Sequence, residues 1–221
     1  METVQSPSTP SDNPNWQAAE STGRRELIAE AATELIAREG MRALTHRAVD
    51  TRLGLPTGST SYYFRTRDEL LAATVAHLRR HSAAHLKAEE FPAALGLHGA
   101  DLEAVAGRIA RYLETLMDTC PHHIKARYAL ALELSGREDF ADSIADLPVQ
   151  RSQAVELFTT LGSSDPQTLA AGFIALLEGL LFRSLLEQDG KALVPKGRRA
   201  EVFREAIASY LLGVAESDLP A

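Results

Sequence analysis

The chain has 221 residues and a mass of 24.0 kDa, which suits one large domain or two smaller ones. Apolar residues make up 45% and charged residues 24%, so wholesale disorder and a fibrous fold are excluded. The single cysteine excludes an internal disulfide framework and a multi-cysteine zinc site. No apolar run approaches the ~20 residues that span a bilayer, and residues 1–16 lack the apolar core of a secretory signal. We therefore expect a cytoplasmic protein with no membrane partner.

Charge is distributed unevenly along the chain. The formal net charge is −7, but residues 24–80 carry +3, from ten arginines and seven acidic residues. Residues 1–23 carry −3 and residues 81–221 carry −7. A small basic segment followed by a larger acidic one indicates two modules with different functions, and the charge of the basic module permits it to bind nucleic acid.

The pattern of apolar residues predicts an all-α protein without internal repeats. Residues 1–20 are expected to form a disordered tail, because they are polar and rich in Ser, Thr and Pro. Pro148 must kink or split the helical pattern in which it lies. Apolar spacing of three and four residues predicts helices at 24–39, 46–53, 57–64, 66–90, 102–120, 123–134, 139–161, 166–189 and 196–214.

The stretch from Leu44 to Phe64 is the most informative. It consists of two predicted short helices separated by Gly54-Leu55-Pro56, which is the turn length of a helix-turn-helix. In that motif the second helix enters the major groove of DNA. Small and hydroxylated side chains at 57–60 favour a close approach to bases and phosphates, and the tyrosines that follow offer phenolic donors. On pattern alone, a three-helix packing module with a polar surface is an equal alternative.

Several short motifs in this region occur at a characteristic spacing. They are an amphipathic helix ending at Gly40, Thr45-x-Arg47-x-Val49, Leu53-Gly54-Leu55, Gly58-Ser59, Tyr63-Phe64 and Arg67-Asp68-Glu69-Leu70-Leu71. With these motifs the chain resembles the N-terminal DNA-binding domain of the TetR family of bacterial transcription regulators over about residues 24–75. The resemblance implies an N-terminal helix-turn-helix domain and a C-terminal helical domain for ligand binding and dimerisation, which we expect at residues 21–70 and 71–217.

The resemblance also implies which residues meet DNA. The expected DNA-binding residues are Thr45, His46, Arg47, Thr57, Gly58, Ser59, Thr60, Tyr62, Tyr63 and Arg67. Two positions depart from the family pattern. Asp50 occupies a place where a small Ala usually packs, so its side chain must be paired or partly exposed. Ser61 occupies a place where an aromatic residue is frequent, which leaves open whether Tyr62 or Tyr63 contacts phosphate.

The C-terminal domain offers candidates for two further roles. An effector pocket would be lined by aromatic and polar residues, for which the candidates are Tyr112, Met117, Arg127, Tyr128, Phe140 and Phe173. The last two helices have wide apolar faces that belong either to the protomer's own core or to a four-helix interface with a second copy, and we favour the interface. Its expected residues are Phe173, Leu177, Leu180, Phe203, Ile207, Tyr210 and Leu211.

Two groups could indicate other chemistry. His77, His81 and His85 recur every four residues and could share a metal, but a polar border beside an apolar stripe is the favoured interpretation. Cys120, followed by His122 and His123, could form a catalytic pair, but a lone cysteine is more often a small buried residue. No nucleotide-binding fingerprint occurs, so we expect no catalytic residue, metal or cofactor, and not an enzyme.

Together these features predict a homodimeric regulator that binds double-stranded operator DNA. A repressor released by an unidentified small-molecule effector is the preferred form. An activator, or a regulator without a ligand, is the nearer alternative. A helical enzyme or adaptor that retains a head resembling a helix-turn-helix is the remote one.

Overall fold

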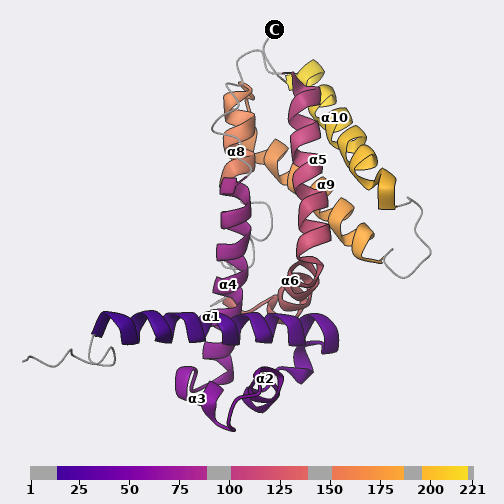
Figure 1. Cartoon of the computed structure of the whole chain (residues 1–221). Coiled ribbons are helices and arrows are strands. Elements are labelled where there is room, and N and C mark those ends of the chain that lie inside the picture. The colour runs from indigo at the N-terminus through magenta and orange to yellow at the C-terminus, as the bar shows by residue number, and fades with distance from the viewer. Residues whose placement is uncertain (1–13, 89–100, 139–150, 187–195, 219–221) are drawn as a thin grey trace, which may run out of the picture. The chain divides into compact units, whose positions relative to one another are not determined.

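The computed structural model describes residues 14–88, 101–138, 151–186 and 196–218, and all regular structure in these residues is helical (Figure 1). This confirms the predicted all-α class. The elements are α1 Pro14–Glu39, η2 Met41–Ala43, α2 His46–Leu53, α3 Ser59–Tyr63, α4 Arg67–Ala88, α5 Leu102–Thr119, α6 Pro121–Leu134, α8 Arg151–Thr160, α9 Pro166–Leu186, η4 Lys196–Arg198 and α10 Arg199–Asp218. The chain divides into two compact units, 1–77 and 78–221, which we call unit 1 and unit 2.

Two predicted boundaries need correction. Helix α1 begins at Pro14, so residues 14–20 are helical, and the rest of the expected tail lies outside the described residues. Helix α3 begins at Ser59 rather than at residue 57, because Gly58 has a φ of 96° and a residue in that left-handed region cannot continue a right-handed helix. The predicted helical segments 139–150 and 187–189 also lie outside the described residues.

Unit 1 is built around α1. Ile28, Leu35 and Ile36 are buried on one side of this helix, whereas Leu27 is 54% exposed. The unit's other fully buried side chains include Phe64 and Leu70, which come from the segments on either side of the α3–α4 junction. In Figure 1, α1 runs across α4, and α2 and α3 lie together on one side of α1.

A charged cluster joins α1 to α4 inside unit 1. His77 of α4 is only 4% exposed. Its Nδ1 lies 2.7 Å from Oε2 of Glu26, and its Nε2 lies 2.7 Å from Oε2 of Glu30. Both ring nitrogens must donate to these carboxylates, and only the protonated ring can do so. Burial by itself lowers the pKa of His77, but the hydrogen bonds and charges of Glu30 and Glu26 outweigh it and raise the pKa above 6.5.

Substitution of His77 by Gln should remove a pH-dependent part of the stability. The pKa of His77 is raised on folding. The contribution of the charged ring to the free energy of unfolding is therefore complete below the unfolded-state pKa near 6.5, and it is lost as the pH rises through the folded-state pKa. We expect wild type to unfold at a higher temperature than His77→Gln at about pH 6, with a difference that shrinks toward about pH 9. Circular dichroism melts across this range measure it, and a constant difference would contradict a charged imidazole.

The core of unit 2 is formed by α5, α6, α8, α9 and α10. Helix α5 packs along α10, and α8 packs along α9. The ring of Phe173 on α9 lies 5.6 Å from that of Phe158 on α8 and 5.5 Å from that of Tyr210 on α10. Aromatic side chains therefore join three of the helices at one point in the core.

This packing corrects the expected dimer interface. The side chains that are buried within the protomer, each at most 3% exposed, are Phe173, Leu177, Phe203, Ile207 and Leu211. A second copy cannot reach them, so for these five residues the expectation of an interface is wrong. Leu180 and Tyr210 are partly buried, and their assignment to an interface stays a prediction.

Helix α9 carries apolar residues around most of its circumference. By length and composition it could cross a membrane, with a mean hydropathy of 1.8 over 18 residues, so the expectation that no segment reaches this threshold is corrected. Four of its side chains nevertheless belong to the core of unit 2, and Arg183 lies in its last turn. Length and composition do not distinguish a core helix from a spanning one.

Gly172 allows α9 and α10 to approach closely. A Cβ atom at this position would lie 2.5 Å from the Tyr210 hydroxyl, which donates a hydrogen bond to the carbonyl of Leu169 at 2.9 Å. Gly172 therefore permits close packing of α9 against α10. A Cβ at Gly179 would meet nothing within 4 Å, so Gly179 has no such role within the described part of the protomer.

Substitution of Gly172 by Ala should fail to give the usual stabilisation. Alanine in a helix interior gains ~1 kcal/mol over glycine, but here the Tyr210 hydroxyl must move and lose its bond to Leu169. We expect Gly172→Ala to be no more stable than wild type in urea unfolding at fixed protein concentration. The matched control is Gly107→Ala on α5, where a Cβ would make ordinary contacts at 3.6 and 3.9 Å and should gain that ~1 kcal/mol.

The clash can be isolated in a second background. Tyr210→Phe removes the hydroxyl, leaving the nearest ring atom, Cζ, 3.5 Å from the new Cβ. In this background Gly172→Ala should stabilise the protein as Gly107→Ala does. Equal gains in both backgrounds would contradict the close approach.

Candidate nucleic-acid interface

Helix α2 is limited by its own sequence at both ends. Thr45 caps it, because its hydroxyl accepts a hydrogen bond from the amide of Ala48 at 3.1 Å. Gly54 ends it in the left-handed conformation with a φ of 62°. A short turn then leads to α3, which has only five residues and whose N-cap, Gly58, offers no side chain.

Asp50 connects α2 to the start of α3. The residue is 2% exposed, and its Oδ1 accepts hydrogen bonds from the amide and the hydroxyl of Thr60 at 2.8 and 2.6 Å. Its Oδ2 accepts from the amide of Gly58 at 2.8 Å. The Asp50 carboxylate thus accepts the amides at the start of α3, which an N-cap side chain would accept if Gly58 had one. The expectation that Asp50 must be paired or partly exposed is confirmed, because it is paired.

The ionisation of Asp50 follows from these bonds. Burial alone would raise its pKa, but the side-chain and backbone hydrogen bonds from Thr60, the backbone hydrogen bond from Gly58 and the nearby His46 together hold the pKa below the usual 3.8. The contribution of Asp50 to stability is therefore present above about pH 3.8 and is lost as the pH falls through the lowered pKa. At neutral pH the carboxylate is charged and acts only as an acceptor.

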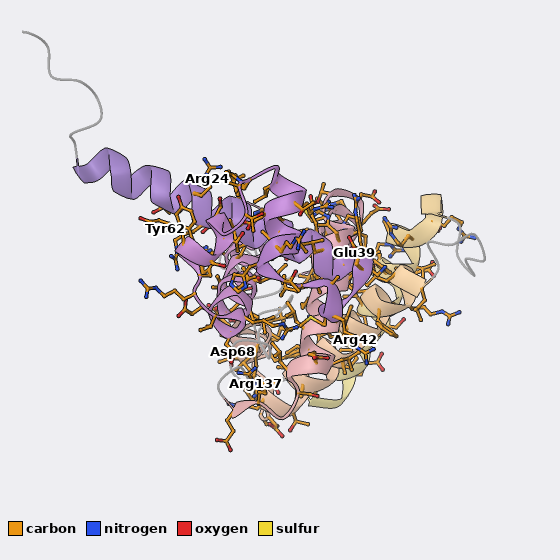
Figure 2. The ribbon with its side chains drawn as sticks, turned by 90° about the horizontal axis from the view of Figure 1, so that it is seen from below. Arg24, Glu39, Arg42, Tyr62, Asp68 and Arg137 are labelled. Carbon is orange, nitrogen blue, oxygen red and sulfur yellow. The ribbon has the colours of Figure 1, made fainter. Side chains whose placement is uncertain are left out.

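Several expected DNA-binding side chains lie on the surface of α2, the turn and α3. Thr45, Arg47 and Thr57 are exposed. Tyr62 is 82% exposed and projects outward from α3 (Figure 2). These four side chains combine hydroxyl donors with one positive charge, the groups that proteins use to bind phosphate oxygens and base edges.

Thr60 does not belong to this exposed set. Its side chain is fully buried, with 0% exposure, and its hydroxyl is used by Asp50. The expectation that Thr60 contacts DNA is therefore wrong: with only one and a half turns, α3 must turn one of its residues toward α2, and Thr60 occupies that position.

Three other expected residues are held by the fold. Nε2 of His46 donates to the carbonyl of Phe64 at 2.8 Å. The Ser59 hydroxyl donates to the carbonyl of Pro56 at 2.7 Å, and the amide of Gly58 donates to Asp50. Ser59 and His46 are partly exposed and Gly58 is exposed. A direct role of these residues in DNA binding stays a prediction.

The two tyrosines differ in their surroundings. Their rings meet edge to face at 5.2 Å, but Tyr63 is only partly exposed, and its carbonyl accepts a hydrogen bond from Arg25 at 2.7 Å. The Arg25 guanidinium also lies 4.2 Å from the centre of the Phe64 ring. Sequence reasoning missed Arg25, which lies far from the motif in the chain.

The start of α4 is fixed by a capping arrangement. Thr66 accepts a hydrogen bond from the amide of Glu69 at 3.1 Å, and the Glu69 carboxylate accepts from the amide of Arg65 at 2.7 Å. Arg67 is exposed, and its Nη2 donates to the carbonyl of Met41 at 3.0 Å. Arg67 therefore bridges α4 to η2 and still presents its guanidinium at the surface.

An open groove of about 880 Å³ lies between α1 and α2. Leu27, Leu35 and Leu53 contribute apolar surface to it, and Thr45 and Arg47 lie among its lining residues. Arg52 forms an ion pair with Glu34 there. The groove belongs to unit 1, whereas the effector pocket was expected in residues 71–217.

In unit 2, two of the expected effector residues form one polar cluster. The guanidinium of the buried Arg127 donates to both carboxylate oxygens of Glu178, at 2.7 and 2.5 Å. The Tyr128 hydroxyl donates to the same carboxylate at 2.6 Å, and the Arg127 guanidinium lies 4.4 Å from the centre of the Tyr128 ring. Burial and the neighbouring Glu178 raise the pKa of Tyr128 above its ordinary value, against the opposing charge of Arg127. Sequence reasoning missed Glu178, 51 residues from Arg127.

The remaining candidates are dispersed. Tyr112, Met117 and Phe173 are part of the apolar core of unit 2, and Phe140 lies outside the described residues. Cys120 is half-buried at the start of α6, where the ring of His123 meets those of His122 and His81 at 4.5 and 4.8 Å. The side chain of His85 lies outside the described part of the chain.

The sequence matches two family models. Residues 28–74 match "Bacterial regulatory proteins, tetR family", and residues 100–214 match "Tetracyclin repressor-like, C-terminal domain". The chain belongs to the TetR family of transcriptional regulators. Its members are DNA-binding regulators rather than enzymes, and α2 and α3 are the helix-turn-helix of this protein.

Solved structures agree with this assignment. A TetR-family member from Streptomyces coelicolor A3 is 26% identical, over 83% of this chain and 97% of its own, with a TM-score of 0.59. The multidrug binding protein EbrR in complex with ethidium is 25% identical, over 83% of this chain and 98% of its own, with a TM-score of 0.57. A TetR-family regulator from Rhodococcus sp. shares the fold at 21% identity, over 86% and 99%, with a TM-score of 0.67. No curated protein matches the sequence.

Proposed function

We propose that this protein is a cytoplasmic, homodimeric repressor that binds operator DNA and leaves it when a small molecule binds unit 2. The observation that carries the proposal is the exposed set of Thr45, Arg47, Thr57 and Tyr62 on the helix-turn-helix. In this proposal α3 enters the major groove, with Thr57 closest to the bases. Arg47, Tyr62 and Arg67 bind backbone phosphates on either side.

Phosphate contacts by Arg47 give a direct test. Arg47→Ala should weaken binding to every duplex and reduce the slope of log affinity against log salt by about one. Arg111→Ala is the control, because it removes the same charge from an exposed position on α5 of unit 2. It should leave both the affinity and the slope unchanged.

The duplex for this measurement comes from selection of a random-sequence pool by the wild-type protein, with fluorescence anisotropy as the readout. Failure to enrich any sequence would overturn the proposed function. An unchanged slope for Arg47→Ala would remove Arg47 from the phosphate contacts and leave the function standing.

A second copy is needed because one small head covers only one half-site of an operator. Helix α9 offers a surface for it. Ala175, Gly179, Phe182 and Leu186 recur at helical spacing and are exposed. Burying an apolar stripe of this kind against its copy is favourable, and the absence of a side chain at Gly179 allows a close approach. We therefore place the proposed interface on this stripe and on the partly exposed Leu180 and Tyr210.

Charges placed on this stripe should separate the dimer. Ala175→Glu combined with Leu186→Glu would bury four carboxylates in the proposed interface, which is far more costly than leaving them in water. We expect a folded monomer by light scattering. Leu132→Glu is the control, since Leu132 is 77% exposed on α6, and it should remain dimeric. A stable dimer of the double variant would contradict this interface.

Release from DNA requires the ligand to prefer the state that does not fit the operator. Shifting the population from 1:99 to 99:1 takes about a 10⁴-fold preference, or ~5.5 kcal/mol. Ethidium is a flat aromatic cation, and because EbrR binds it, aromatic cations are the first class of effector that we propose. The ring of Tyr128, which meets that of Phe182 at 5.2 Å, and the carboxylate of Glu178 are groups of the kind that bind such ligands.

A further inference from the structure

Helix α3 depends on another helix for its position. A five-residue helix is too short to be stable by itself. Its N-cap is a glycine, so the amides at its start find no side-chain acceptor on the cap residue. Its one fully buried side chain is that of Thr60, while Ser61 and Tyr62 next to it are exposed. Whatever holds Thr60 therefore determines where the exposed side chains of α3 lie.

Asp50 holds α3 at several points at once. Its backbone carbonyl accepts a hydrogen bond from the amide of Leu55 in the turn, at 2.8 Å. Its carboxylate accepts the amide of Gly58 on one oxygen, and the amide and hydroxyl of Thr60 on the other. One residue near the end of α2 thus fixes both the turn and the first residues of α3.

Hydrogen bonds constrain a short helix differently from apolar packing. Their strength depends on distance and direction, whereas two apolar side chains can slide past each other with little loss. The three bonds to the Asp50 carboxylate measure 2.6 to 2.8 Å. Together they fix the rotation of α3 about its own axis, as well as its distance from α2. A rotation of α3 would break at least one bond and leave a buried donor unsatisfied.

We propose that Asp50 and Thr60 form a specificity-determining pair, which aligns α3 and the turn before it so that the exposed Thr57 and Ser61 meet base edges. Asp50 does not touch DNA in this proposal and acts as a positioning residue through Thr60 and Gly58. The inference rests on the proposed DNA-binding function. The proposal predicts that loss of the pair lowers the affinity for the operator, because base contacts need a well-aligned α3. The affinity for random DNA should stay unchanged, because it needs only positive charge.

The test compares two duplexes: the sequence that wild type enriches from a random pool, and a scrambled sequence of the same composition. Dissociation constants are measured by anisotropy for full-length wild type, Asp50→Ala, Thr60→Val and Thr60→Ser. All are measured at a temperature where circular dichroism shows each variant folded. Thr60→Val keeps the volume of the side chain but removes its hydroxyl, and Thr60→Ser keeps the hydroxyl.

We expect Thr60→Val to lose about tenfold in affinity for the selected duplex, Asp50→Ala to lose more, and both to bind the scrambled duplex like wild type. In Thr60→Ser, the ratio of the affinities for the selected and the scrambled duplex should stay within about twofold of the wild-type ratio, because the serine hydroxyl can still donate to Asp50. If Asp50→Ala does not fold, Thr60→Val decides the question by itself.

Three results would overturn the inference. Discrimination by Thr60→Val equal to that of wild type would show that the pair does not align α3. Equal losses on both duplexes would show a general structural role. Thr60→Ser behaving like Thr60→Val would show that the hydroxyl bond is not responsible. Failure of wild type to enrich any sequence is a different outcome, because it removes the proposed function and this inference with it.

Discussion

A helix of one and a half turns is not held in a fixed orientation by its own backbone, and the helix-turn-helix of this protein depends on a contact that fixes α3. The buried carboxylate of Asp50 makes this contact, because it accepts hydrogen bonds from two amides and one hydroxyl at the start of α3. The cost of desolvating that charge is offset because three donors face it. Tyr62 on α3 and Thr57 in the turn before it are exposed at defined positions only because the buried side of α3 is fixed.

Elements determined by nearby residues could be predicted from the sequence. Helix α2 has the predicted bounds because Thr45 caps it and Gly54 ends it. The sequence pattern predicts the start of α3 two residues too early, since the positive φ of Gly58 is a property of the folded turn. The family resemblance places Thr60 among the DNA contacts, and a helix this short offers too few apolar positions for periodicity to show that Thr60 faces inward. For Asp50, by contrast, the departure from the family pattern predicts a side chain that is paired or partly exposed, and the structure shows that it is paired.

Contacts between distant segments were the ones that the sequence could not reveal. Apolar faces on α9 and α10 are visible in the pattern, but the pattern does not tell whether the same chain or a second copy covers them. Leu177 and Ile207 are covered by the protomer itself, whereas Ala175 and Leu186 are exposed. Glu178 was missed for the same reason, because nothing near it in the sequence shows that Arg127 is its partner.

The ion pair between Arg127 and Glu178 has a consequence for how this chain can evolve. Either residue without the other leaves an uncompensated charge in a mostly desolvated place, a loss of roughly 3–5 kcal/mol. The pair can therefore be exchanged only as a unit. Recombination between related genes with a crossover anywhere between codons 127 and 178 would separate the partners, unless both parents encode them. In hybrid regulators built from fragments of two related proteins, the fragments should be joined before residue 127 or after residue 178.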